Sequence, residues 1–151
     1  MSAPKFEHIT VATDGSAYGQ QAVETAIDLA KKYGAQLEVV SVVPLTPVYV
    51  AAAEPWVPVE VAQAETSHYR SVLSAAVQKA EAEGLAAVTG ILLEGVVIDE
   101  LIAHVEHGPT DLLVLGSRGL SAAKRLLLGS VSDAVMHHLK VPVLLVRGPP
   151  S

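Results

Sequence analysis

The chain has 151 residues and a mass of 15.7 kDa, the usual size of one compact domain, and we expect residues 1–151 to fold as a single domain. It has no cysteine, which excludes disulfides, thiolate metal sites and a cysteine nucleophile. Its 10 Lys and Arg residues stand against 16 Asp and Glu residues, and the resulting net charge of -6 argues against nucleic-acid binding through a basic face.

The hydrophobic content, 50% of all residues, raises the question of a membrane span. The longest uncharged stretch lies between Glu38 and Glu54, and it contains Pro44 and Pro47, which break a helix. A span needs about 20 predominantly apolar residues. The segment Met1–His8 has no apolar region typical of a signal peptide. We therefore expect a soluble, cytoplasmic protein that makes no membrane contact.

In the first half of the chain, short apolar strands alternate with amphipathic helices. The segment Gln36–Val43 is rich in β-branched residues, which is typical of a parallel strand covered on both faces. Four prolines predict an irregular loop over Pro44–Val59. The other elements expected here are a strand at Phe6–Thr13, a helix at Ala17–Tyr33 before Gly34, and a helix that ends near Glu83.

The second half repeats this alternation. A short helix is predicted by apolar residues at helical spacing, and Gly108-Pro109 ends it. The apolar residues of that helix are Ile98, Leu101, Ile102 and Val105, and the remaining expected elements are strands at Ala86–Leu93, Asp111–Leu115 and Val143–Val146 and a helix at Ser130–Leu139. The alternating order predicts an α/β fold whose parallel sheet has helices on both faces.

Two of the predicted strand ends carry small and polar residues. Asp14-Gly15-Ser16 follows the first strand, and Gly116-Ser117-Arg118-Gly119 follows the fourth. Open α/β sheets bind ligands beyond the carboxyl ends of their strands. Nine residues separate Gly119 from Gly129-Ser130, which opens a predicted helix whose free N–H groups and positive dipole end favour a phosphate. Hydroxyl groups at Ser130 and Ser132 and positive charges at Arg118, Lys124 and Arg125 add to this chemistry.

This glycine spacing, Gly-x2-Gly-x9-Gly-Ser, resembles the ATP-binding signature of the universal stress protein family. The resemblance extends to Ile9–Ser16 at the first strand end, to Ser41–Pro44 at the second and to the closing Val141–Val146. It covers essentially the whole chain in the expected order. The chain departs from the family pattern at Ala12, where proline is frequent, and at Gly95–Val97, where Gly-x-Pro is frequent.

The resemblance implies a Rossmann-like, doubly wound sheet of five parallel strands in the order 3-2-1-4-5 with four helices. It also implies a bound adenine nucleotide (ATP, or else ADP or AMP), with Mg²⁺ held mainly through the phosphates. In the family, the aspartate at the Asp14 position contacts the nucleoside, and the backbone at the Val42 position pairs with adenine. The implied binding residues are Ala12, Thr13, Asp14, Val42, Gly116, Ser117, Arg118, Gly119, Gly129, Ser130, Val131 and Ser132, of which the last four hold the phosphates.

Simpler structural roles compete with these assignments. Asp14 is also a common turn residue, and Ser130 with Asp133 resembles a helix capping box. Glu100, His104 and His107 share one helix face, but they lack the His-Glu-x-x-His order of a zinc protease. We expect these histidines to face solvent, and we expect no metal held by side chains.

The sequence thus predicts an ATP-binding stress-response protein in which nucleotide occupancy acts as a switch or sensor. No catalytic residue is assigned. A slow ATP hydrolase or phosphotransferase that uses the same pocket is one alternative, and a scaffold dimer that no longer binds nucleotide is another. The last strand, Val143–Val146, is expected at a sheet edge, where pairing with a second copy would form a homodimer.

Overall fold

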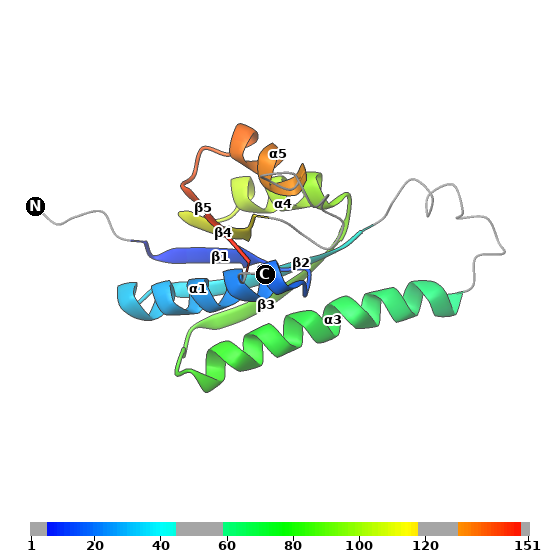
Figure 1. The fold of residues 1–151 in the computed structure, drawn as a ribbon, viewed down its shortest axis with the longest axis horizontal. Helices are drawn as coiled ribbons and strands as arrows, with labels where there is room; N and C mark the ends of the chain where they lie inside the picture. Colours follow the sequence, from blue (N-terminus) through cyan, green and yellow to red (C-terminus); the bar gives the residue numbers. More distant parts are fainter. Residues whose placement is uncertain (1–5, 45–58, 118–129, 149–151) are drawn as a thin grey trace, which may run out of the picture.

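A computed structural model describes residues 6–44, 59–117 and 130–148, with only the backbone given for 59–63. Strands and helices alternate along the described chain, as the sequence predicts (Figure 1). The strands are β1 (His8–Ala12), β2 (Gln36–Pro44), β3 (Val88–Gly95), β4 (Leu112–Gly116) and β5 (Val143–Val146), and the helices are α1 (Ala17–Tyr33), α3 (Val59–Ala82), α4 (Val97–His107) and α5 (Ser130–His138). Most of the loop expected between Pro44 and Val59 lies outside the described residues.

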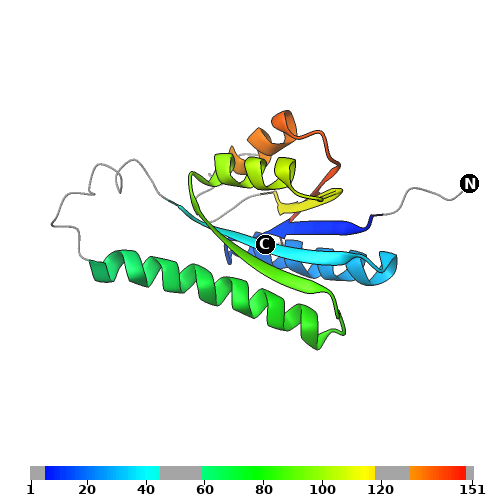
Figure 2. The ribbon, with the colours of Figure 1, turned by 180° about the vertical axis from the view of Figure 1, so that it is seen from behind.

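The five strands form one parallel sheet in the order β3-β2-β1-β4-β5, which confirms the predicted fold and strand order. β1 lies in the centre and pairs with β2 on one side and with β4 on the other. In the described part of the chain, α1 and α3 cover one face of the sheet, and α4 and α5 cover the other (Figures 1 and 2). The fold is therefore a three-layer, doubly wound α/β structure.

Two apolar clusters, one on each face of the sheet, hold these layers together. Alternate residues of a strand point to opposite faces, so Val39 packs under α1 and α3 while its neighbour Val40 packs under α4 and α5. Leu113 and Val114 of β4 divide between the two clusters in the same way. Burial on both faces explains why these strands read as nearly continuous apolar runs.

The first strand begins at His8 rather than at the predicted Phe6, and at its carboxyl end a turn and a helix cap replace the last predicted residue. β1 ends at Ala12 rather than Thr13. Ser16 caps α1 by accepting a hydrogen bond from the Gly19 N–H at 3.1 Å. Gly34 ends the same helix with a φ of 65°, a left-handed conformation that favours glycine.

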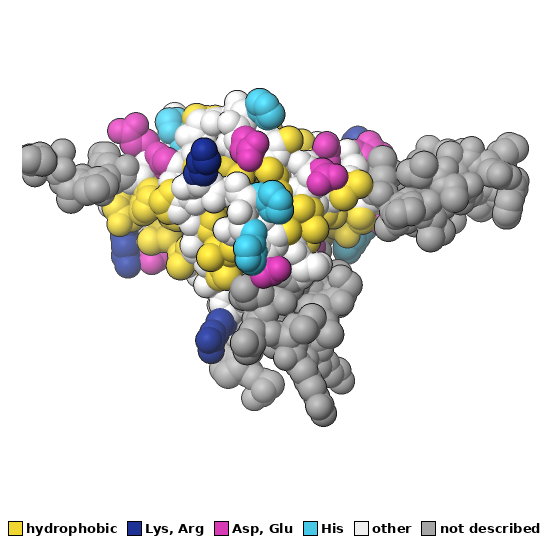
Figure 3. Space-filling model, turned by 90° about the horizontal axis from the view of Figure 1, so that it is seen from above, with side chains coloured by type: hydrophobic (Ala, Val, Ile, Leu, Met, Phe, Trp, Pro, Cys, Tyr) yellow, Lys and Arg dark blue, Asp and Glu magenta, His cyan; other side chains and the backbone are white. Residues whose placement is uncertain are grey.

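The expectation that the α4 histidines face solvent is correct for His107 and wrong for His104. His107 is exposed, whereas His104 is half-buried and its Nε2 is hydrogen-bonded to the Glu38 carboxylate of β2, 66 residues away in sequence. This contact fastens α4 to the sheet. Figure 3 looks onto the α4 and α5 side and shows other histidine side chains exposed there. None of the helices in the described ranges combines the length and apolar character needed to cross a bilayer.

Candidate functional site

The strand order reverses at β1, and this reversal locates the candidate site. From β1 the chain first builds β2 and β3 on one side of the sheet and later returns to build β4 and β5 on the other. The segments that follow β1 and β4 therefore leave neighbouring strand ends in opposite directions and open a crevice between them. Two of the predicted binding segments, Thr13-Asp14 and Gly116-Ser117, begin at these two strand ends.

The turn after β1 is held firmly by its own side chains. The Asp14 carboxylate accepts a hydrogen bond from the Ser16 N–H at 2.9 Å, and the Thr13 hydroxyl accepts one from the Gly15 N–H at 3.2 Å. Gly15 has a φ of 84°, which an L side chain rarely adopts. The Thr13 backbone is tied to β2, because the Ser41 hydroxyl donates to the Thr13 carbonyl at 2.8 Å. Asp14 is thus a turn former, as its simpler role predicts.

β2 runs past the end of β1 and presents backbone groups to the crevice. The last paired residues of β1 and β2 are Ala12 and Val40. The Thr13 N–H still donates to the Val40 carbonyl at 3.0 Å, so the backbone groups of Val40 face β1. Strand periodicity is two, so the N–H and C=O of Val42 face the same side, beyond the point where β1 ends. This placement suits a residue that pairs through its backbone.

Gly116 lies where the end of β4 meets the start of α1. A methyl group placed on this glycine would come within 2.9 Å of the Tyr18 backbone. That distance leaves no room for a side chain. Packing against Tyr18 therefore requires glycine at position 116, in addition to the predicted role of Gly116 beside a ligand. Its neighbour Ser117 is buried and donates its N–H to the Val146 carbonyl of β5 at 2.8 Å.

A hydrogen bond between Ser132 and Gly116 fixes the first turn of α5 beside the end of β4. The Ser132 hydroxyl donates to the Gly116 carbonyl at 2.8 Å, and Ser132 is buried. In this arrangement the hydroxyl already has an acceptor, whereas the side chain of Ser130 is exposed. Val131 packs partly into the cluster under α4 and α5. The amino end of α5 is therefore held at the crevice, where its first N–H groups lie near the end of β4.

The structure brings together most of the predicted site residues. Ala12, Thr13, Asp14, Val42, Gly116, Ser117, Ser130, Val131 and Ser132 all lie at or beside the carboxyl ends of β1, β2 and β4. Arg118, Gly119 and Gly129 lie outside the described residues, as do Lys124 and Arg125. In the ranges that are described, no group of three or more histidine or acidic side chains is arranged to hold a metal ion.

Sequence reasoning missed one side chain beside the site, Tyr69 of α3. The pKa of Tyr69 is raised above its ordinary value of 10.0, first by burial and then by the negative charges of Asp14 and Glu65. One helical turn further along, the Val72 side chain lies where a side chain on Gly15 would have to go, only 2.8 Å away. In the sequence, the helical spacing of apolar residues assigns Tyr69 to the packing face of its helix. This spacing contains no information on the distance between Tyr69 and Asp14.

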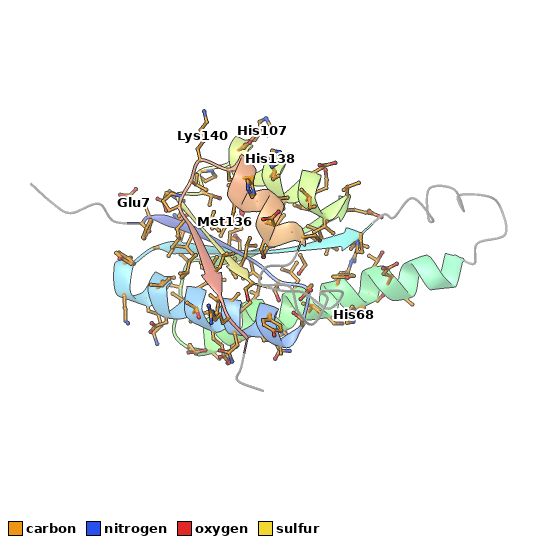
Figure 4. The ribbon with its side chains drawn as sticks, turned by 45° about the horizontal axis from the view of Figure 1, so that its top comes forward. Glu7, His68, His107, Met136, His138 and Lys140 are labelled. Carbon is orange, nitrogen blue, oxygen red and sulfur yellow. The ribbon has the colours of Figure 1, made fainter. Side chains whose placement is uncertain are left out.

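Two open grooves lie on the described surface. One, of about 420 Å³, runs between α1 and α3 and reaches the turn after β1, with Thr13, Gly15 and Val72 in its lining. His68 of α3, labelled in Figure 4, lines it as well. The other groove, of about 350 Å³, lies at the amino ends of the strands, around Thr10 and Thr110. It is therefore at the opposite end of the sheet from the candidate site.

The model of the universal stress protein family matches residues 5–147. The chain belongs to the universal stress protein family. A universal stress protein of Methanocaldococcus jannaschii is 32% identical over 145 residues, covering 95% of this chain and 84% of that protein. The universal stress protein YxiE of Bacillus subtilis is 32% identical over 148 residues, covering 94% of this chain and 99% of its own.

Solved structures agree with this assignment. A universal stress protein from Lactobacillus plantarum shares the fold with a TM-score of 0.83 at 23% identity, covering 96% of this chain and 100% of that chain. A universal stress protein determined in complex with cAMP gives a TM-score of 0.68 at 27% identity, covering 95% and 98% of the two chains.

We predict different effects for the two serines of α5. Ser132→Ala should lower the free energy of unfolding by about 1–3 kcal/mol, because it leaves the Gly116 carbonyl without its buried partner. Ser130→Ala should change it by less than about 0.5 kcal/mol, since that side chain is exposed. Urea unfolding of both variants measures the difference. Equal losses would contradict the assigned role of Ser132.

A second prediction concerns the ionisation of Tyr69. Its pKa is raised in the folded chain, so its contribution to stability is present below pH 10.0 and is lost as the pH rises through the folded-state value. Tyr69→Phe should therefore lose less stability than wild type above pH 10.0. Asp14→Asn should lower the pKa of Tyr69 while keeping an oxygen that accepts from Ser16. Absorbance titration, with Tyr69→Phe as the reference, measures this pKa; an unchanged value in Asp14→Asn would contradict the assignment.

Proposed function

We propose that this universal stress protein binds an adenine nucleotide (ATP, ADP or AMP) at the carboxyl ends of β1 and β4, and that occupancy acts as a cytoplasmic switch or sensor in the stress response. The observation that carries the proposal is the Ser132–Gly116 hydrogen bond. It holds the amino end of α5 beside the strand-order reversal, so that free helix N–H groups and a nucleotide-binding crevice coincide.

The phosphates are assigned to the α5 side of the crevice. The amino end of a helix carries about half a positive charge and several free N–H donors, which together favour an anion. Ser130 is exposed on the first turn and adds a hydroxyl donor. The glycine spacing from Gly116 to Gly129 supplies backbone without side chains for close approach. This combination supports phosphate binding in an otherwise acidic protein.

The nucleoside is assigned to the β1 and β2 side. Asp14 supplies a carboxylate at the end of β1, and its turn is fixed by the hydrogen bonds of Thr13 and Asp14. The Val42 backbone presents one donor and one acceptor past the end of β1, and this pattern fits the edge of an adenine ring. The cAMP complex of a structurally similar universal stress protein supports the same ligand class, since cAMP contains adenine, ribose and phosphate.

Magnesium fits this proposal as part of the nucleotide. Mg²⁺ is usually held by substrate phosphates, waters and one or two carboxylates rather than by a protein cage. The ion would neutralise part of the phosphate charge there.

We also propose that two copies pair through β5. This strand lies at the sheet edge, and Leu144 is exposed on it. The Leu113 N–H donates to the Pro142 carbonyl at 3.0 Å, and the Ser117 N–H donates to the Val146 carbonyl at 2.8 Å. The backbone groups of the even-numbered residues of β5 therefore face β4. The backbone groups of Val143 and Leu145 consequently face away from the sheet. Pairing with a second β5 would satisfy them and remove an open edge.

The nucleotide assignment predicts that Gly129→Val abolishes ATP binding while the fold is kept, because a branched side chain would occupy the space where backbone and phosphate meet. Ala87→Val adds the same branched group to an exposed residue at the opposite end of the sheet, and it should bind ATP like wild type. Calorimetric titration, with circular dichroism as the folding control, measures both. Wild-type affinity in a folded Gly129→Val protein refutes the phosphate assignment.

The assembly proposal predicts that wild type sediments at twice the 15.7 kDa chain mass at micromolar concentrations. Leu145→Pro should reduce the mass to that of one chain, because it removes an outward N–H donor from the edge strand. Leu145→Val keeps this donor and should remain a dimer. Sedimentation equilibrium compares the three proteins; a folded Leu145→Pro dimer would exclude this edge as the contact.

A further inference from the structure

Helix α3 brings side chains to the nucleotide crevice from the side opposite α5. It begins beyond the carboxyl ends of the strands and runs back alongside the sheet (Figures 1 and 2). Its middle touches the turn after β1, because Val72 lies directly against Gly15. The part of α3 just before Val72 is therefore level with the carboxyl edge, where a nucleotide would lie.

Tyr69 stands on this part of α3, one turn before Val72 and on the same face of the helix. Its ring packs edge to face against the neighbouring His68 ring, with 5.2 Å between centroids and 77° between planes. Tyr69 belongs to neither apolar cluster of the described residues, although Leu73 and Val77 further along α3 pack against the cluster under α1. The half-buried ring therefore lies outside the two apolar clusters.

The electrostatics of Tyr69 agree with a position near the turn after β1, which the contact of Val72 with Gly15 already indicates. The Asp14 carboxylate contributes to the raised pKa of its phenol, which requires the two groups to lie within reach of each other's field. A phenol with a pKa at or above 10.0 is neutral at physiological pH, so the Tyr69 side chain does not repel a phosphate. A neutral aromatic ring beside the carboxylate assigned to the nucleoside is well suited to a planar base.

We infer that the ring of Tyr69 packs against the nucleoside of the bound adenine nucleotide and forms the α3 wall of the pocket. This inference rests on the proposed function and adds to it a contact that depends on the nucleoside and not on the number of phosphates. When an aromatic side chain that contacts a base is replaced by alanine, the affinity for the ligand typically falls by roughly fivefold to hundredfold. Tyr69 would then be a binding residue on α3, a helix that lies outside the glycine signature.

The experiment compares the affinities of Tyr69→Ala and Tyr69→Phe for ATP and AMP by calorimetric titration. Tyr69→Ala should weaken both nucleotides by the same factor, about tenfold. Tyr69→Phe keeps the ring and should bind both within about twofold of wild type. Gln78→Ala, on an exposed part of the same helix, serves as the matched control and should change neither affinity. If Tyr69→Ala fails to fold, Tyr69→Leu replaces it as the ring-free variant.

Each result separates this inference from the proposed function. A wild-type protein that binds neither ATP nor AMP refutes both. If wild type binds ATP and the folded ring-free variant binds it equally well, the Tyr69 contact is overturned while the proposed function stands. A loss confined to ATP would place Tyr69 at the phosphates, and a loss in Tyr69→Phe equal to that in Tyr69→Ala would assign the effect to the hydroxyl. Either outcome overturns the ring contact.

Discussion

The short turn from Thr13 to Ser16 is the constraint on which the carboxyl edge of the sheet depends. Its backbone is hydrogen-bonded to Val40 and Ser41 of the neighbouring strand β2. The last residue of the turn, Ser16, caps α1. The turn thus ends the central strand, starts the helix that covers it and offers Gly15 as the surface against which α3 packs. A change in its conformation would move three elements together, because each is fixed to it by a separate contact.

On the other side of the crevice, Gly116 makes two contacts that contribute both to packing and to the proposed binding site. Gly116 admits the backbone of Tyr18 at a distance that no side chain allows, and its carbonyl receives the Ser132 hydroxyl. The ends of β4, α1 and α5 therefore meet at one residue. A glycine that the family signature associates with the ligand is therefore also required by the packing of α1 against the end of β4.

Much of the candidate site could be assembled from the sequence because its residues follow strand ends. Asp14 and Gly116 come directly after two apolar runs, and parallel strands bring their carboxyl ends to one edge of the sheet. His104 shows where this reasoning fails. Its helical spacing is compatible with solvent, but its partner Glu38 lies 66 residues earlier, and no local pattern identifies a contact at that separation. The electrostatic influence of Asp14 on Tyr69 could not be predicted for the same reason.

The sequence by itself determined the alternation of strands and helices, the burial of both sheet faces and the small residues at the strand ends, because each depends on local periodicity or backbone freedom. The strand order followed from the family resemblance and was confirmed in the sheet. Only the tertiary structure decided that the Ser132 hydroxyl is used by Gly116 and that Tyr69 lies near Asp14. Such contacts join distant segments, and their geometry is set by how helices pack on a twisted sheet.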